Sequence, residues 1–217
     1  MGSIVPPLST NVALTLKTDY CGNMIYENGQ LSKILTDVGY ITLANSTPTY
    51  HYYLQDHLGN NRVVIDEHGQ VEQVNHYYAF GGLMAESTGG GAQSYKYNGK
   101  ELDRMHGLDW YDYSARHYDA VLGRWMCVDP LAEKYQAIGD YVYCAGNPIK
   151  LIDSDGRKID IHYTDSKGEE HSIPYSVNMN NHVDNEFANS TIDALNQIYG
   201  YEHAKTVLDV LIKSEYS

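Results

Sequence analysis

Cysteine, phenylalanine and basic residues are scarce in this chain of 217 residues. Its three cysteines, Cys21, Cys127 and Cys144, lie far apart and form no CxxC pair, which argues against a zinc site built on thiolates. Two arrangements remain open: one disulfide with one free thiol, or three buried free thiols, which we favour. The sequence predicts no metal site and no cofactor.

Positive charge and long apolar runs are also lacking. Lys and Arg total 15 against 28 Asp and Glu, for a formal net charge of -13, so the core is not expected to bind nucleic acid, whose phosphates need Lys and Arg. No apolar run approaches the roughly 18–20 residues of a membrane span, and residues 1–16 do not have the pattern of a signal peptide. Because the chain begins in mid-pattern, we interpret it as part of a longer exported protein, secreted or at the cell surface.

Tyrosine and glycine are abundant instead, with 21 Tyr and 19 Gly against 2 Phe. This composition is typical of many short strands joined by tight turns. Tyrosine-bearing strands recur with glycine or Asn-Gly turns between them, for example at Asn28-Gly29 after a strand expected over residues 20–26. Each hairpin leaves one apolar face open, so neighbouring hairpins have to stack. The fold class predicted is mainly β with antiparallel hairpins.

The pattern changes after Arg157. Residues 158–163 and 169–175 read as two strands. A helix is expected from Ser190, with Ser190 or Thr191 as its N-cap and Gly200 just after its end. A second helix is expected over residues 204–211 from its apolar stripe. The tail is therefore predicted to be a small α+β region with two C-terminal helices.

Several motifs occur in a fixed order along the chain: YHYYLQDHLGNNRVVIDEHGQV, YYAFGG, YNGKELD, GLDWYDYSARHYDAVLGRWMCVDPLAEKY and YVYCAGNPIKLIDSDGR. They resemble the RHS (YD-repeat) family of polymorphic toxins and cell-surface proteins, and in particular the RHS-repeat-associated core domain of the Bacteroidetes type. The resemblance implies a lead-in over residues 1–17, repeats and core over 18–157, and the start of a variable effector region over 158–217.

The resemblance also implies a function. Such a core closes one end of a β-shell and presents a C-terminal effector, in a setting of interbacterial competition. Its implied partners are the rest of the shell and an immunity protein for the tail. The tyrosines offer an alternative, a module that binds glycans or surfaces by stacking, but cross-strand packing of the tyrosines is the interpretation we favour.

In self-cleaving relatives, aspartates near the end of the core cut the chain, which needs one protonated and one ionised carboxylate close together. By resemblance, Asp129 is the first of these. Asp140 and Asp153 are the candidates for the second, and Gly156–Arg157 is the implied cleavage region. The enzymatic hypothesis is restricted to this self-cleavage.

Three residues depart from the pattern of self-cleaving relatives: Val128 replaces an arginine, Ser154 replaces a proline, and Arg157 replaces a leucine or methionine. The alternative interpretation is that Asp129 and Asp153 are turn aspartates that accept hydrogen bonds from the backbone. For Arg116 and Arg124, a structural ion pair is the default expectation. The tail histidines, His162, His171, His182 and His203, lack the spacing of a metal-binding helix and are interpreted as surface residues.

Overall fold

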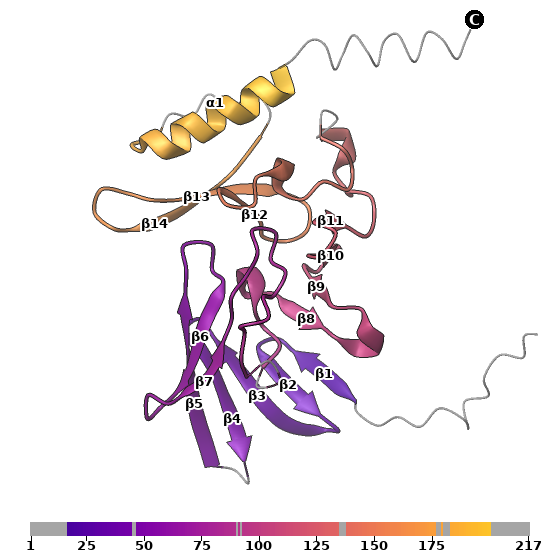
Figure 1. Ribbon diagram of the computed structural model, residues 1–217, viewed down its shortest axis with the longest axis vertical. Helices are drawn as coiled ribbons and strands as arrows, with labels where there is room; N and C mark the ends of the chain where they lie inside the picture. Colours follow the sequence, from indigo (N-terminus) through magenta and orange to yellow (C-terminus); the bar gives the residue numbers. More distant parts are fainter. Residues whose placement is uncertain are drawn as a thin grey trace, which may run out of the picture. The chain divides into compact units, whose positions relative to one another are not determined.

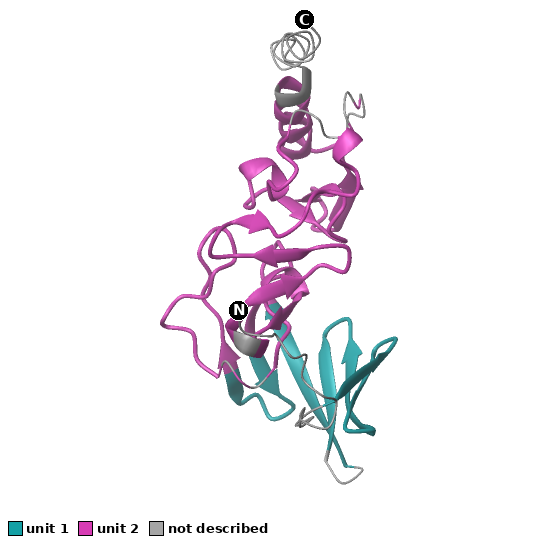
Figure 2. Ribbon diagram, turned by 90° about the vertical axis from the view of Figure 1, so that its right-hand side faces the viewer, with its two compact units in different colours: residues 1–54, 64–72 teal, residues 55–63, 73–217 magenta. Residues whose placement is uncertain are grey.

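The computed structural model describes residues 17–44, 47–89, 91, 93–134, 138–176, 179 and 183–200. The chain divides into two compact units (Figure 2), the first comprising Met1–Leu54 and Val64–Glu72 and the second Gln55–Val63 and Gln73–Ser217. Most regular structure is antiparallel β, which confirms the predicted fold class. The lead-in, except for Lys17, and the second C-terminal helix lie outside the described residues.

The first seven strands follow one another in sheet order, as consecutive hairpins do (Figure 1). They are β1 (Thr18–Cys21), β2 (Met24–Glu27), β3 (Gln30–Thr36), β4 (Gly39–Ala44), β5 (Thr47–Gln55), β6 (Asn61–Asp66) and β7 (Val71–Val74). Asn28 and Gly29 both have positive φ, 52° and 81°, so the predicted Asn-Gly hairpin turn between β2 and β3 is confirmed. The single strand expected over residues 20–26 is wrong, because Gly22 (φ 61°) turns the chain and divides it into β1 and β2.

A histidine organises the interior of the first unit. The Tyr40 ring stacks on the His51 ring, with centroids 4.3 Å apart. His51 Nδ1 lies 2.6 Å from Glu72 Oε2, and its Nε2 lies 2.9 Å from Thr42 Oγ1. Both ring nitrogens are thus satisfied although His51 is buried.

The second unit contains two smaller sheets and one described α-helix. The four-stranded sheet has the order β11 (Arg124–Trp125), β10 (His117–Asp119), β9 (Trp110–Asp112) and β8 (Glu101–Asp103). The three-stranded sheet has the order β12 (Leu151–Asp153), β13 (Ile159–Thr164) and β14 (Glu170–Pro174), and it is followed by α1 (Glu186–Gly200). Short 3-10 turns connect these strands at Tyr97–Gly99, Met105–Gly107, Ala132–Lys134 and Cys144–Gly146.

Aromatic rings fill the centre of the second unit. Tyr118 pairs with Tyr111 on one neighbouring strand and with Trp125 on the other. Tyr143 stacks on Tyr118 with ring centroids 4.1 Å apart, and its hydroxyl lies 3.1 Å from that of Tyr113. All five side chains are at most 1% exposed. The rings of Tyr113 and Tyr143 are buried and their hydroxyls are hydrogen-bonded, which explains why tyrosine suits these positions better than phenylalanine.

The helix begins earlier than the sequence predicts. It starts at Glu186, and the Asn185 side chain accepts a hydrogen bond from the Ala188 amide at 2.9 Å, as an N-cap does. The prediction that Ser190 or Thr191 caps this helix is therefore wrong. Their hydroxyls lie inside the helix and donate to the Phe187 carbonyl instead. Among the described residues, no helix is long and apolar enough to span a membrane.

Neither of the two arrangements predicted for the cysteines, one disulfide with one free thiol or three buried free thiols, is fully confirmed. All three are free, which excludes a disulfide among them in this structure. Cys144 is buried as expected, but Cys21 and Cys127 are exposed, so the prediction of three buried thiols is wrong for these two. Cys21 lies at the end of the edge strand β1 and Cys127 in the loop after β11, where no core covers them.

Gly81 provides a sharp test of the aromatic core. It has φ 88°, and a Cβ at this position would lie 2.5 Å from the Tyr97 ring. We expect Gly81→Ala to lower the free energy of unfolding by about 1–2 kcal/mol for the left-handed backbone and by a further ~1–3 kcal/mol for overpacking. Gly168→Ala is the control, because Gly168 has a similar φ of 84° and open space around it. Chemical denaturation of both variants should separate the two costs, and equal losses would contradict the packing assigned to Tyr97.

Candidate functional site

The candidate site is centred on Arg116, which lies between β9 and β10. Its side chain is only 2% exposed. The guanidinium carbon lies 4.1 Å from the centre of the Trp125 ring, an arrangement that stabilises a desolvated cation. The tight turn before β10 fixes the residue, since the Tyr113 amide donates to the Arg116 carbonyl at 3.1 Å. A buried cation at this position requires anionic partners nearby.

Two aspartates from distant parts of the chain supply the negative charge. Arg116 Nη2 lies 2.9 Å from Asp129 Oδ2, in the loop after β11, and 3.0 Å from Asp153 Oδ2, at the end of β12. Both carboxylates are largely buried, with side chains 13% and 3% exposed. The structure therefore brings together two of the three aspartates that the sequence singles out. One guanidinium serves two carboxylates, so the cluster carries a net charge of -1 when both are ionised.

Asp140 contacts this cluster through its main chain and not through its carboxylate. Its backbone carbonyl accepts a hydrogen bond from Arg116 Nη1 at 3.3 Å and another from the Asp129 amide at 3.2 Å. The residue itself is exposed. Asp140 thus helps to hold Arg116 and Asp129 through its main chain, whereas the carboxylates of Asp129 and Asp153 are the pair that meets on the guanidinium.

The implied cleavage region lies against two of these side chains, Arg116 and Asp153. Arg116 Nε donates to the Gly156 carbonyl at 2.6 Å. On the other side of that peptide bond, the Arg157 amide donates to Asp153 Oδ1 at 2.9 Å. Glycine is required at 156, because φ is 74° and a Cβ would lie 3.0 Å from the Arg116 backbone nitrogen. The oxygen of the Gly156–Arg157 peptide therefore faces a cation and its nitrogen faces a carboxyl group.

Burial raises the pKa of Asp153 to about 6. The positive charge of Arg116 and the amides of Lys158 and Arg157 oppose this rise by favouring the ionised form, but desolvation is the larger effect. A carboxyl group with this pKa exchanges its proton near neutral pH, which suits an acid or base in catalysis.

The other interpretation, that the two aspartates cap turns, is also supported, because Asp129 Oδ1 accepts a hydrogen bond from the Leu131 amide at 2.7 Å.

A small cavity of about 20 Å³ adjoins the cluster. Arg116, Asp129 and Asp153 all line it, together with the apolar side chains of Ile138 and Val142. This volume is enough for one water molecule, and Arg116, Asp129 and Asp153 are among its potential polar partners. Cys144 also lines the cavity, but burial raises the pKa of its thiol well above the usual range, so it is not suited to act as a thiolate nucleophile.

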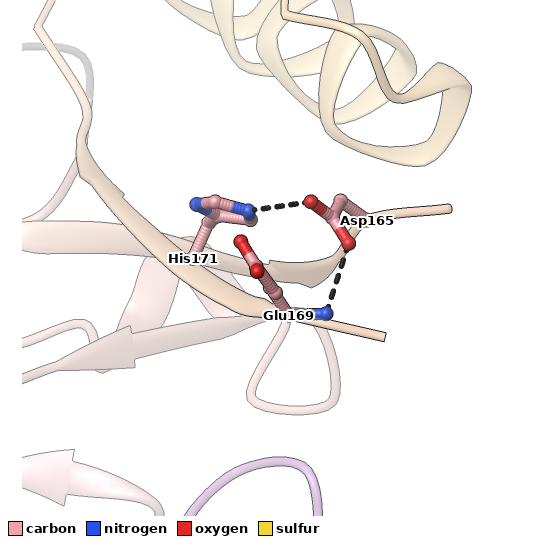
Figure 3. Close-up of side chains that lie close together, drawn as sticks. All are labelled: Asp165, Glu169 and His171. Carbon is pink, nitrogen blue, oxygen red and sulfur yellow. Dashed lines mark hydrogen bonds and ion pairs between the residues drawn. The ribbon is translucent and has the colours of Figure 1, made fainter. Parts of the chain in front are cut away.

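A second cluster lies on the β13–β14 hairpin (Figure 3). Asp165, Glu169 and His171 place one potential ligand atom each within 4.8 Å of one another. A hairpin turn accounts for their positions, since Asp165 Oδ1 accepts from the Lys167 and Glu169 amides. The other carboxylate oxygen lies 3.1 Å from His171 Nε2, and this interaction lowers the pKa of Asp165. Of the other tail histidines, His162 contacts Ser172, whereas His182 and His203 lie outside the described residues.

No family model matches the chain. Two curated proteins show sequence similarity. One is the toxin subunit YenC1 of Yersinia entomophaga, 30% identical over 66% of this chain and 16% of the relative. The other is salivary gland surface protein 1 of Aedes aegypti, 34% identical over 50% of this chain and 3% of the relative. The chain thus spans less than a fifth of either relative.

Solved structures of toxin complexes share the fold. The crystal structure of TcdB2-TccC3 matches with a TM-score of 0.51 and 22% identity, over 69% of this chain and 8% of the other. The crystal structure of TcdB2-TccC3-TEV matches with a TM-score of 0.52 and 21% identity, over 65% of this chain and 8% of the other. At this identity the likeness concerns the fold alone. The sequence similarity to YenC1 relates this chain to part of a toxin subunit.

Arg116 is the functional candidate that sequence reasoning missed. The structural ion pair expected of it is confirmed, and the same side chain also joins Asp129, Asp153 and the Gly156 carbonyl. Nothing in its spacing from these residues indicates that they meet. The one available signal was its position inside the tyrosine-rich motif, at the turn into β10, whose middle residue Tyr118 is buried.

Proposed function

We propose that this chain is a structural and delivery module of an RHS-type polymorphic toxin or cell-surface protein. In this proposal, residues 18–157 are repeats and a core domain of the Bacteroidetes type that close a β-shell, and residues 158–217 begin the variable effector. The observation that carries it is the chain of consecutive antiparallel hairpins, joined to a fold shared with TcdB2-TccC3. The proposal places the complete protein outside the cell or at its surface, with the remaining shell as the principal partner.

Electron cryo-microscopy of the complete natural protein tests this role. The expected result is a hollow β-shell in which the seven-stranded sheet forms part of the wall. A string of separated domains with no enclosed volume would contradict it.

The proposed effector leads to a separate test. If residues 158–217 begin a toxin for interbacterial competition, the complete tail expressed inside bacteria should stop growth, and an immunity protein encoded beside it should restore growth. Unimpaired growth at high tail expression would argue against the effector role and leave the closing role in place.

A glycan-binding role is the alternative. Tyr50 and Tyr52 are exposed and two residues apart on β5, so both lie on one face of that strand. Exposed rings on one face suit stacking on sugars, but Tyr97, Tyr111, Tyr113, Tyr118 and Tyr143 of the second unit are buried in its core. Retention on glycan arrays that is lost in a Tyr50→Ala, Tyr52→Ala double variant would favour this alternative.

The geometry around Arg116 supports a second proposal, self-cleavage at the Gly156–Arg157 bond. Asp129 and Asp153 are the reacting carboxylates, and Asp140 positions Arg116 and Asp129 through its carbonyl. Arg116 holds the Gly156 carbonyl oxygen, where negative charge develops during attack on the peptide carbon. Asp153 faces the nitrogen that leaves. The departures at Val128, Ser154 and Arg157 remove none of these contacts, since Arg116 already supplies the cation.

The proposed reaction is a hydrolysis with one water molecule. Ionised Asp129 takes a proton from the water, and the hydroxide oxygen bonds to the Gly156 carbonyl carbon. Arg116 Nε stabilises the resulting oxyanion. Protonated Asp153 donates its proton to the Arg157 nitrogen as the carbon–nitrogen bond breaks. The products are a Gly156 carboxyl group and an Arg157 amine, and the two aspartates have exchanged protonation states.

This mechanism predicts a defined pH dependence. Because the pKa of Asp153 is raised to about 6, its acidic form dominates below that pH and declines above it. The rate of cleavage should therefore fall about tenfold for each pH unit between 7 and 9. Protein purified at pH 9, where the mechanism predicts the slowest cleavage, is transferred to buffers across this range, and the fraction that remains uncut is followed by mass. A rate that rises with pH over this interval would rule out Asp153 as the acid.

A further inference from the structure

The turn between β13 and β14 fixes the position of the Asp165 carboxylate. Asp165 Oδ1 accepts hydrogen bonds from the Lys167 amide at 2.8 Å and from the Glu169 amide at 2.9 Å. The main chain closes the same turn, because the Gly168 amide donates to the Asp165 carbonyl at 3.1 Å. The turn therefore uses one carboxylate oxygen of Asp165 and leaves Oδ2 for another partner.

Three potential ligand atoms converge beside this turn. The carboxylates of Asp165 and Glu169 and the imidazole of His171 point toward one another (Figure 3), with one ligand atom each within 4.8 Å of the others. His171 Nε2 lies 3.1 Å from Asp165 Oδ2, and the Tyr163 ring stacks on the imidazole with centroids 5.2 Å apart. Two ligands at a tetrahedral angle on zinc, with bonds of about 2.0–2.1 Å, lie about 3.3 Å apart. The aspartate and the histidine thus already have nearly the spacing that a metal ion requires.

The cluster carries more negative than positive charge. The two carboxylates contribute -2 when ionised, and a protonated His171 would still leave -1. In the described part of the chain, no lysine or arginine forms an ion pair with Asp165 or Glu169, and the ion-pair partner of Asp165 is His171. A divalent cation bound between the three side chains would remove this excess charge.

The ligand types indicate the class of metal. Imidazole together with carboxylates suits first-row transition metals such as Zn²⁺, whereas Mg²⁺ and Ca²⁺ prefer oxygen ligands alone. Three protein ligands leave the fourth position of a tetrahedral zinc ion open. His171 also lines a cavity of about 170 Å³, to which His57, His162 and Glu170 contribute. A water molecule or small ligand therefore has room beside the imidazole.

We propose that Asp165, Glu169 and His171 form a binding site for a divalent first-row transition metal ion, with Zn²⁺ as the best-matched ion. Asp165 Oδ2, one Glu169 carboxylate oxygen and His171 Nε2 are the ligands. The ion takes the place of the hydrogen bond between Asp165 and His171. Sequence spacing did not reveal this site, because its ligands meet across a hairpin turn and not on one face of a helix. The site depends neither on a closed shell nor on self-cleavage.

Isothermal titration calorimetry of the complete chain with zinc chloride tests the site. The expected result is one zinc ion per chain, bound more tightly than Mn²⁺, with no measurable binding of Mg²⁺. Nitrogen NMR of the histidine rings should show that zinc shifts the Nε2 signal of His171 most. Absence of saturable zinc binding, or shifts confined to other histidines, would overturn the proposal.

Glu169→Gln is the most informative variant. The Glu169 side chain is exposed, and its carboxylate forms no hydrogen bond among the described residues, so the substitution should leave the fold intact. Zinc affinity should fall at least about tenfold, because even the outer-shell partners of metal ligands contribute that much. Glu170→Gln is the matched control, since it removes the same charge one position along from a carboxylate outside the cluster. Its affinity should stay close to that of the original chain.

A pair of histidine variants provides the second comparison. His171→Ala should abolish zinc binding at the site. His162→Ala should not, because His162 contacts Ser172 and lies on the face of β13 opposite to Tyr163, which stacks on His171. Equal zinc affinities within either pair of variants would mean that the ion binds elsewhere on the surface, and would overturn the proposal.

Discussion

Asp153→Asn is expected to lower the rate of self-cleavage by at least about a hundredfold, the lower end of what a general acid contributes. Asparagine has the shape of aspartate and keeps the oxygen that accepts hydrogen bonds from the Arg157 and Lys158 amides. It has no acidic proton to donate. The fold should therefore persist while the reaction stops. Product is followed by mass from freshly purified protein at pH 6.

Asp155→Asn is the matched control for this variant. Asp155 Oδ1 also accepts from the Arg157 amide, at 3.0 Å, but Asp155 forms no ion pair with Arg116 among the described residues. Cleavage should continue close to the original rate. If instead Asp155→Asn stops the reaction and Asp153→Asn does not, the assignment of the acid is wrong.

Arg116→Met is expected to lower the free energy of unfolding by about 3–5 kcal/mol and to abolish cleavage. Methionine fills part of the volume over Trp125, but it leaves Asp129 and Asp153 buried without their shared cation. Removing one partner of a buried ion pair is costly because the remaining charge cannot be solvated. Urea denaturation followed by Trp fluorescence measures the loss.

Arg104→Met is the control for the loss of an arginine. Arg104 and Asp109 form an exposed ion pair at 3.3 Å, with side chains 52% and 58% exposed. Solvent screens such pairs, so this variant should change stability by no more than about 1 kcal/mol. Equal effects of the two substitutions would mean that the Arg116 cluster is solvated and does not behave as a buried site.

Local patterns were sufficient where neighbouring residues determine the conformation. The Asn28-Gly29 turn was predicted because both residues tolerate positive φ, which the structure confirms. The same rule was not applied to Gly22, although it also has positive φ, and one strand was predicted in place of two. The helix start was misplaced because Ser190 resembles an N-cap, whereas the residue that caps the helix is Asn185.

The candidate site depended on contacts that local patterns cannot reveal. Resemblance to a family singled out Asp129, Asp140 and Asp153, but only the fold distinguishes the carboxylates of Asp129 and Asp153 from the exposed Asp140. Arg116 meets Asp153 across 37 positions of sequence, through packing of two sheets in the second unit. Neither the hydrophobic periodicity nor the turn residues predict this contact, because it depends on how separate elements pack together.

The central claim is that Asp129, Asp153 and Arg116 cut the chain at the end of the core. The most direct test is the intact mass of the freshly purified chain, measured beside that of Asp129→Asn under denaturing conditions. The account predicts two fragments from the original chain, one ending at Gly156 and one beginning at Arg157, and a single full-length mass from the variant. A full-length mass in both samples, or the same fragments from both, would contradict it.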